Sequence, residues 1–314
     1  MVGFIRLVTE KYVSLSDAKK KVLRRKMKNV RIKYPHAIEL KLTKLLIEYN
    51  KKLSLSLMRW IENNEKRWNR DSWENEILVH LNIYFEQELE TMLNDPKVIG
   101  IDIQKQVEKL FILLYSFNKA QFMKIIKDIL GESYYGSEMW WDNLRKQWNK
   151  VFYERTRKVA YGFVDKIKDI IYKGIQKNRE FSEILSDIKK ANKTFTIKKA
   201  NFIARDLIGS ANSLFQKNMH TSIGIDMYTW QTMVDERVRG RPGGKYPTAV
   251  PSHWAMEGLV CSWYDPTVYS EDGMVWKHRS SLMPKAQVGE EYACRCLPVP
   301  YFATILNQID RGLI

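Results

Sequence analysis

Cysteines and histidines in the last quarter of the chain are the residues whose types could bind a metal. Cys294 and Cys296 are one residue apart, and His253, Cys261 and His278 precede them. Cysteine sulfur and imidazole nitrogen are typical ligands of tetrahedral zinc. Structural zinc sites usually draw on two Cys-x(2–4)-Cys pairs, whereas this chain has one closer pair. We therefore expect no metal and no other cofactor, with zinc at His253, Cys261, Cys294 and Cys296 as the alternative.

Some of these residues are also types used in catalysis. His253 with Cys294 could supply a base and a nucleophile. The carboxylates of Asp235, Glu257 and Asp265 could bind magnesium. The sequence has no nucleophile elbow, Walker loop or His-Glu-x-x-His helix, however, so the rest of a catalytic site has no counterpart in it. We predict that the protein is not an enzyme; a metal-dependent nuclease or toxin is the enzymatic alternative.

A run of cations near the start of the chain could bind a polyanion. The first 52 residues carry 15 Lys and Arg against 4 Asp and Glu. Such a run neutralises phosphates and gives salt-sensitive, sequence-independent nucleic-acid binding. A solvated helix face and an arm docked on an acidic protein are the other interpretations. Neither a helix-turn-helix fingerprint nor zinc-finger spacing is present, which argues against base-specific readout. The candidate contacts are Lys19, Lys20, Lys21, Arg24, Arg25, Lys26, Lys28, Arg31 and Lys33.

The elements that carry these residues differ between the two parts of the chain. Up to about residue 220, apolar residues recur at helical spacing with Lys and Glu on the other face, which predicts amphipathic helices. We expect the last helix to begin at Thr194 or Thr196, because a threonine hydroxyl can cap the first turn. The predicted helices cover residues 16–29, 37–63, 73–93, 101–131, 137–177, 179–191 and 196–219.

Composition changes sharply near residue 230. Residues 231–314 have nine charges of each sign, so the whole net charge of +16 lies before them. They also hold seven of the nine prolines and all three cysteines. Met227-Tyr228-Thr229-Trp230-Gln231-Thr232 alternates apolar and polar side chains, which predicts a strand. The sequence therefore predicts an α+β protein, with a basic and mainly helical region at 1–184 and a small α+β C-terminal module at 185–314.

Hydropathy argues against a protein that spans a membrane by helices and against a secreted protein. No run of about 18 apolar residues occurs, so no transmembrane helix is predicted. The first twelve residues are interrupted by Arg6 and Glu10, and we therefore expect no signal peptide. Three cysteines cannot form a disulfide framework and suit a reducing compartment.

Three motifs of the C-terminal module stand in a characteristic order. They are Tyr-x-Trp-x-Thr-x-x-Asp-x-Arg-Val-Arg from Tyr228, a histidine with a glycine five residues later, and Gly-Glu-(x3)-Cys-Arg-Cys-x-x-x-Pro from Gly289. Together with Arg205 in the preceding helix, they resemble the phage Mu F-like head-morphogenesis family over about residues 185–300. The matching residues are Arg205, Trp230, Asp235, Arg237, Arg239, His253, Gly258, Cys294, Arg295 and Cys296.

The resemblance implies a structural role in a virus particle. Members of this family are few-copy minor head (minor capsid) proteins of tailed phages, associated with the portal and with procapsid assembly. It implies the portal protein, other head proteins and packaged double-stranded DNA as partners, and no membrane. It places the protein in the host cytoplasm during assembly and in the virion (the phage head) afterwards, acting in genome packaging and delivery. A cytoplasmic protein that binds DNA without sequence preference is the alternative.

A charged cluster directly follows the predicted strand and consists of Asp235, Arg237 and Arg239. Two interpretations of this cluster are open. It could contact DNA or the portal, or it could form ion pairs within the protein. Both signs of charge are present and residues 231–314 are neutral overall. We therefore favour an internal ion-pair network.

Overall fold

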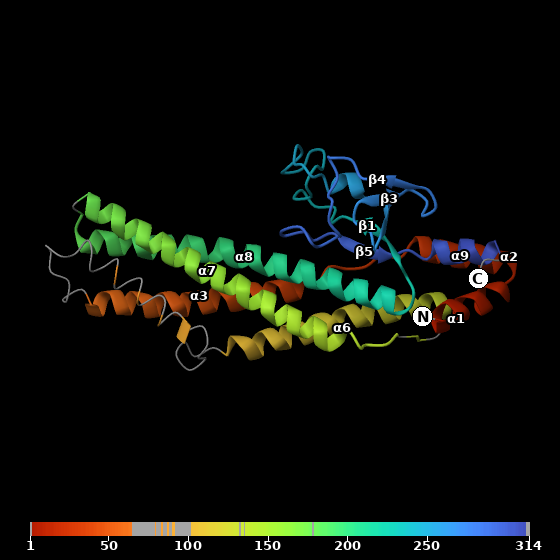
Figure 1. The fold of residues 1–314 in the computed structure, drawn as a ribbon, viewed down its shortest axis with the longest axis horizontal. Coiled ribbons are helices and arrows are strands. Elements are labelled where there is room, and N and C mark those ends of the chain that lie inside the picture. Colours follow the sequence, from red (N-terminus) through yellow and green to blue (C-terminus); the bar gives the residue numbers. More distant parts are fainter. Residues whose placement is uncertain are drawn as a thin grey trace. The chain divides into compact units, whose positions relative to one another are not determined.

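The computed structural model describes residues 2–64, 102–131, 133–134, 136–177 and 179–311, together with Val79, Ile83, Gln87, Glu90 and Thr91. Its long helices are α3 (His36–Asn64), α6 (Ile103–Leu130), α7 (Trp141–Gln176) and α8 (Phe181–Ser222). Shorter helices are α1 (Val2–Val13), α2 (Asp17–Lys28) and α9 (Ala303–Asp310). Figure 1 shows these helices and the small sheet, whose strands lie between α8 and α9 in the sequence, so the α+β class is confirmed.

Most predicted helices are confirmed to within a few residues, and the spacing of their apolar residues explains why. In α6, residues three or four positions apart lie on the buried side, for example Val107, Leu110, Phe111 and Leu114. The helix predicted at 73–93 lies outside the described residues apart from five isolated positions. Among the helices of the described residues, α1 and α9 were not predicted.

The predicted break before residue 196 is wrong. Helix α8 runs without interruption from Phe181 to Ser222, so Thr194 and Thr196 lie inside the helix. An N-cap residue has non-helical backbone angles, whereas here the helix continues through both positions. The amphipathic pattern weakens around residues 191–197, which include Lys193 and Thr194, and this weakening resembles a helix boundary in the sequence.

The chain forms two compact units, each built from several segments. Unit 1 consists of residues 1–36, 112–145 and 205–314, and unit 2 consists of residues 37–111 and 146–204. Helices α6 and α8 each contribute one part to each unit. The boundary predicted between residues 184 and 185 falls within α8. No described helix is both long enough and apolar enough to cross a membrane.

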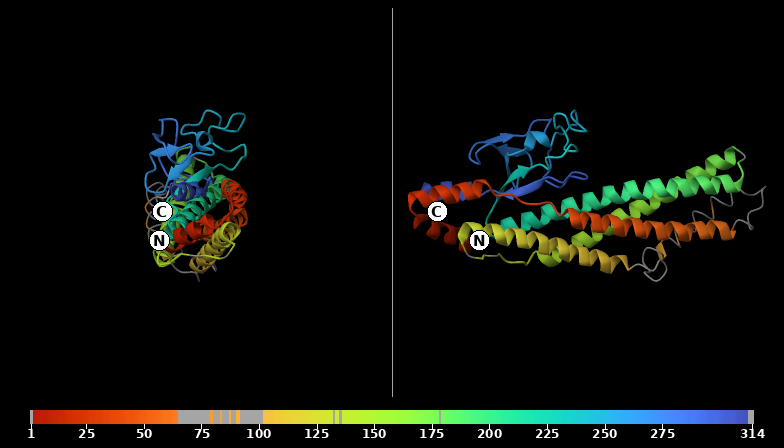
Figure 2. Two further views of the ribbon diagram at one scale, coloured as in Figure 1. Left: turned by 90° about the vertical axis from the view of Figure 1, so that its right-hand side faces the viewer. Right: turned by 180° about the vertical axis from the view of Figure 1, so that it is seen from behind.

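Unit 1 contains a five-stranded antiparallel sheet with the order β4-β3-β2-β1-β5. The strands are β1 (Met227–Gln231), β2 (Val260–Ser262), β3 (Val268–Ser270), β4 (Trp276–His278) and β5 (Leu297–Pro300). The strand predicted at 227–232 is thus confirmed, and it pairs with β2 on one side and β5 on the other. Figure 2 shows the sheet from two further directions.

The core of the sheet region is aromatic. Tyr228 and Trp230, two residues apart on β1, point to the same side and are fully buried. The ring of Tyr228 lies 4.2 Å from that of Trp263, measured between centroids. Both cysteines of the Cys294-x-Cys296 pair belong to this same core. The sheet is therefore held by a cluster in which the motif residues themselves are packed.

Candidate functional site

The loop that carries the cysteine pair is a tight turn anchored on α8. Cys294 N–H donates to the Glu291 carbonyl at 3.1 Å, and Ala293 between them has a φ of 54°. A left-handed backbone costs a residue with a Cβ about 1–2 kcal/mol. Asp206 on α8 compensates, because its carboxylate accepts the Ala293 N–H at 2.9 Å. The turn is thus fixed by a buried side chain 87 residues away.

Gly209, one helical turn beyond Asp206, allows this loop to approach α8 closely. A Cβ at position 209 would overlap the backbone carbonyl oxygen of Cys294, which is not a flexible atom. Ser213 and Ser210 on the same face donate to the carbonyls of Val288 and Gly289. This helix face is therefore the support on which the cysteine loop is held.

Replacing Gly209 by alanine is expected to destabilise the protein by roughly 1–3 kcal/mol, the usual cost of overpacking. Helix propensity alone predicts the opposite sign, a gain of about 1 kcal/mol. Urea unfolding followed by tryptophan fluorescence measures the difference. Ser210→Ala is the control, since it adds no atoms to the same face and removes one hydrogen bond worth about 1 kcal/mol. A Gly209→Ala protein that is more stable than the wild type would show that the cysteine loop does not pack tightly against α8 at this position.

His253 meets both cysteines. It precedes the short 3-10 helix η2 (Trp254–Met256) and is 3% exposed, while Cys294 and Cys296 are 5% and 7% exposed. Its Nδ1 lies 3.4 Å from the Sγ of Cys296 and 3.5 Å from the Sγ of Cys294. The three ligand atoms all lie within 4.8 Å of one another. Sequence positions separated by about 40 residues are thus brought to one point.

The other side of the His253 ring is held by a carboxylate. Its Nε2 lies 2.8 Å from Oε2 of Glu291, and the same oxygen accepts from Arg239 at 2.8 Å. The rings of Trp230 and His253 form an edge-to-face contact, with a centroid distance of 5.6 Å and an interplanar angle of 81°. The ring is therefore fixed in position and in orientation by charged and aromatic neighbours.

These contacts change the ionisation of the cluster. Burial opposes the imidazolium, but hydrogen bonds with Cys294 and Glu291 outweigh it and raise the pKa of His253. The hydrogen bond with Cys296 holds the pKa of the Cys294 thiol well below its ordinary value, against the effect of burial. The same bond and burial raise the pKa of Cys296. The pair therefore favours one thiolate beside one thiol.

Three further charged motif residues, Asp235, Arg237 and Arg295, form ion pairs within the protein. Asp235 lies 2.5 Å from Arg295, which is only 9% exposed, and 3.8 Å from Arg237. Gly258, with a φ of 78°, donates its N–H to the Trp230 carbonyl at 2.9 Å and so starts the turn into β2. The ion pairs of Asp235 lie within the module, as expected from the mixed charges of this cluster.

Two residues considered as zinc ligands lie apart from the cluster. Cys261 is on β2, buried, and burial raises the pKa of its thiol to about 11. His278 is exposed on β4. Within the described ranges, the three-residue group of His253 and the two other cysteines is the one arrangement of metal-ligating side chains, and neither Cys261 nor His278 belongs to it.

The three carboxylates considered for magnesium have separate partners. Glu257 accepts the Thr232 N–H, Asp265 accepts both donors of Thr267, and Asp235 pairs with arginine. In the part of the chain that the structure describes, they do not gather into a metal-binding group.

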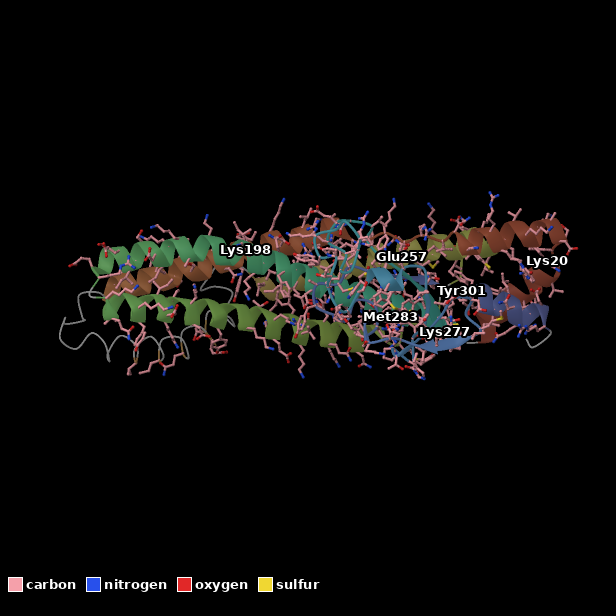
Figure 3. All side chains as sticks on the ribbon, turned by 90° about the horizontal axis from the view of Figure 1, so that it is seen from above. Lys20, Lys198, Glu257, Lys277, Met283 and Tyr301 are labelled. Carbon is pink, nitrogen blue, oxygen red and sulfur yellow. The ribbon has the colours of Figure 1, made fainter. Side chains whose placement is uncertain are left out.

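The basic run lies on and after α2 in unit 1. Of its nine cations, Lys20 is half-buried and the others are exposed. Arg24 is engaged within the protein, since it donates to the Tyr12 hydroxyl at 2.8 Å and pairs with Asp310 of α9. Lys20 lies over the Tyr12 ring at 5.3 Å and is labelled in Figure 3. The buried side of α2 presents Leu23 and Met27, which leaves most cations facing solvent.

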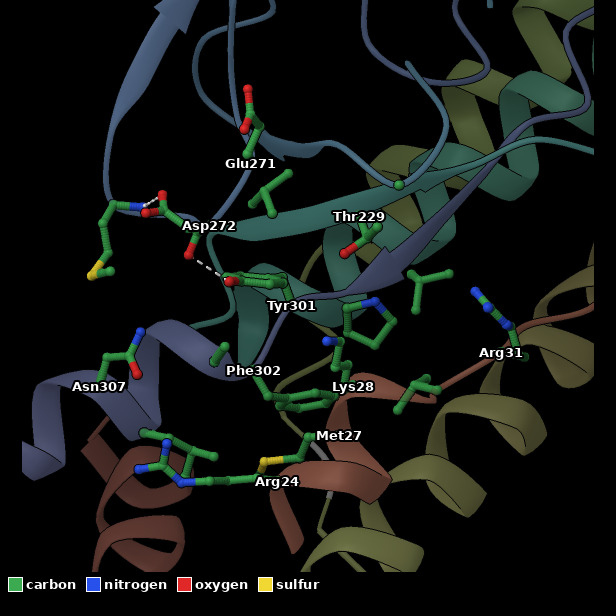
Figure 4. Close-up of a pocket in the computed structure, with 18 residues that line it drawn as sticks. Arg24, Met27, Lys28, Arg31, Thr229, Glu271, Asp272, Tyr301, Phe302 and Asn307 are labelled. Carbon is green, nitrogen blue, oxygen red and sulfur yellow. Dashed lines mark hydrogen bonds between the residues drawn. The ribbon is translucent and has the colours of Figure 1, made fainter. Parts of the chain in front are cut away.

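A pocket of about 530 Å³ in unit 1 is lined by residues of α2, α9 and strands β1, β2 and β5. Figure 4 labels Arg24, Met27 and Lys28 of α2 among the lining residues, together with Phe302 and Asn307. Its walls carry both signs of charge, and Tyr301 donates across it to the carbonyl of Asp272 at 2.6 Å. The His253 cluster does not line this pocket.

No family model matches the chain, and no solved structure matches it. A stretch of 138 residues is 25% identical to an uncharacterized protein of Haemophilus influenzae (strain Rd). The match covers 44% of this chain and 25% of that protein's length.

Proposed function

We propose that this protein is a minor head protein of a tailed phage, present in few copies, that acts in procapsid assembly and genome packaging near the portal. The observation that carries the proposal is the bonding of the motif residues to one another. Arg239 and Glu291 hold His253, His253 contacts both cysteines, and Asp235 pairs with Arg295. Residues of separate motifs thus form one network, which supports taking the motifs together as the signature of a Mu F-like module.

The burial of the network supports a structural role. A nucleophile or general base must reach its substrate. Cys294 and His253 are each at most 5% exposed, and the described pocket of unit 1 at α2 and α9 does not include them. The catalytic interpretation of this pair therefore gains no support, and the protein acts as an assembly component.

The module also has exposed apolar side chains that suit contact with other head proteins. Val234, Tyr246 and Val250 lie on the loop that follows β1 and are 66%, 47% and 63% exposed. Exposed apolar side chains on a loop are available for contact with another protein. We assign this loop to the portal or head-protein contact.

The exposed cations of α2 are assigned to packaged DNA. Changing Lys19, Lys21, Arg25 and Lys28 together to glutamine is expected to flatten the dependence of DNA affinity on salt. Removing one phosphate contact lowers the slope of log affinity against log salt by about 0.9. Arg24 is left unchanged because it supports α9. Fluorescence anisotropy with two duplexes of unrelated sequence, at several salt concentrations, measures the slope.

The matched control changes four exposed lysines of unit 2, Lys41, Lys44, Lys51 and Lys198, in the same way. It removes the same net charge and is expected to leave most of the slope unchanged. If the control flattens the slope as much as the α2 variant does, DNA affinity depends on net charge alone, and α2 is not the binding element.

The proposal as a whole is tested by co-expression with the portal and major head proteins of the same genome. The full chain is expected to sediment with procapsids and to be absent from shells made without the portal. DNA binding without any association with procapsids or portal rings would instead support the cytoplasmic DNA-binding alternative. Nicking of plasmid in magnesium would support the nuclease.

A further inference from the structure

We infer that His253, Cys294 and Cys296 form a binding site for a zinc ion. This contradicts the expectation from sequence, which was based on the lack of a second cysteine pair. The third ligand comes from a distant turn instead. The site is independent of the protein's role in a phage head, because it follows from the geometry of the module alone.

The distances fit tetrahedral coordination. With Zn–N of about 2.0–2.1 Å and Zn–S of about 2.3 Å, a nitrogen and a sulfur on one tetrahedral zinc are about 3.6 Å apart. The Nδ1 of His253 lies 3.4 Å and 3.5 Å from the two sulfurs. A hydrogen bond explains this less well, because a single Nδ1 proton cannot be donated fully to two sulfurs at once.

The surroundings orient the histidine as a ligand. Metal-bound histidines almost always donate their other ring N–H to a carboxylate or carbonyl, which fixes the tautomer. Glu291 occupies that position at 2.8 Å from Nε2, so in the zinc-bound form Nε2 would carry the proton and the Nδ1 lone pair would be free to bind the metal. Arg239 holds Glu291 from the far side at 2.8 Å.

The cysteines are likewise positioned in advance. Asp206 fixes the turn through Ala293, and Gly209 lets the Cys294 carbonyl rest against α8. Two thiolates neutralise the charge of one zinc ion, which suits a site whose ligands are 3–7% exposed. Sulfur and imidazole ligands favour zinc over magnesium or calcium. Three protein donors leave one tetrahedral position for water.

Metal content of the full chain, purified without chelator, tests the site. We expect about one zinc per chain. After removal of the zinc, titration with Co²⁺ should produce the strong visible bands of tetrahedral cobalt and a thiolate-to-cobalt charge-transfer band, and zinc should abolish both. Glu291→Gln keeps all three ligands and is expected to weaken cobalt binding by about 10–100-fold, the usual effect of losing such a partner.

Cys294→Ser with Cys296→Ser should lose the charge-transfer band. Cys261→Ser is the matched control, since it removes another buried thiol of the same core and should leave the spectrum unchanged. The decisive measurement is on the wild-type chain, so a variant that fails to fold does not affect it. Wild-type protein with native circular dichroism that holds no zinc and gives no cobalt bands would overturn the site. So would bands lost in Cys261→Ser and retained in the double variant.

Discussion

Trp230→Ala is expected to cost about 3–5 kcal/mol of the free energy of unfolding, the usual range for a buried tryptophan. Trp230 is fully buried on β1, where its ring meets the imidazole of His253 in an edge-to-face contact and the guanidinium carbon of Arg279 lies 5.6 Å from its ring centroid. Its removal leaves a cavity beneath the cysteine pair and lets the sheet separate from the loop. The variant should therefore lose association with procapsids because the module unfolds.

The matched control is Trp276→Ala, a tryptophan of the same sheet that is 36% exposed on β4. Trp276 lies outside the buried core cluster, so its replacement is expected to cost clearly less than that of Trp230. Urea unfolding and procapsid sedimentation should both separate the two variants. Equal costs for Trp230→Ala and Trp276→Ala would contradict the assignment of the core.

The second large effect concerns pH and His220. This histidine is fully buried at the end of α8, accepts the Trp263 indole N–H at 3.2 Å, and lies 5.6 Å from the Phe122 ring. Burial lowers the pKa of His220 from 6.5 to about 3. Below about pH 6.5, His220 is therefore protonated in the unfolded chain but stays neutral in the folded chain. Stability contributed by the neutral histidine is complete above that pH and is lost as the pH falls toward 3.

Between about pH 7 and pH 5, the loss from this group is expected to be about 2 kcal/mol. Replacing His220 by glutamine keeps an acceptor for Trp263 and should remove that part of the pH dependence. The same change at exposed His278 is the control and should leave the dependence as in the wild type. Urea unfolding at both pH values gives the comparison. An unchanged difference in His220→Gln would show that other groups cause the acid sensitivity.

Local sequence patterns predicted much of the fold because they reflect burial directly. Alternation at Tyr228 and Trp230 indicated β1, and three-to-four spacing indicated most of the helices. Two short helices were missed although their apolar spacing is regular. In α1, Phe4, Val8 and Tyr12 are buried four residues apart. Helix α9 also has regular apolar spacing, but it comes directly after two prolines. Prolines are typical of the strand and loop that precede α9, so the helix was not recognised.

The site could be predicted only in part. Cys294, Cys296 and His253 were recognisable by type, but their convergence depends on contacts between distant segments. Glu291 gave no signal of its own, since a glutamate beside a cysteine pair resembles any surface acid. The contacts of Asp206 and Gly209 with the cysteine loop could not be predicted from the sequence either. Predicting them requires knowing which face of α8 the loop packs against. Residue types identify candidate ligands, whereas tertiary contacts decide which of them meet.

Quantitative mass spectrometry of purified phage particles that encode this chain tests the proposed role most directly. We expect the full chain in DNA-filled heads at a few copies, in constant ratio to the portal protein and far below the major head protein. We expect the same ratio in procapsids before packaging. Absence from both particles, or a copy number that follows the major head protein, would contradict the proposed role.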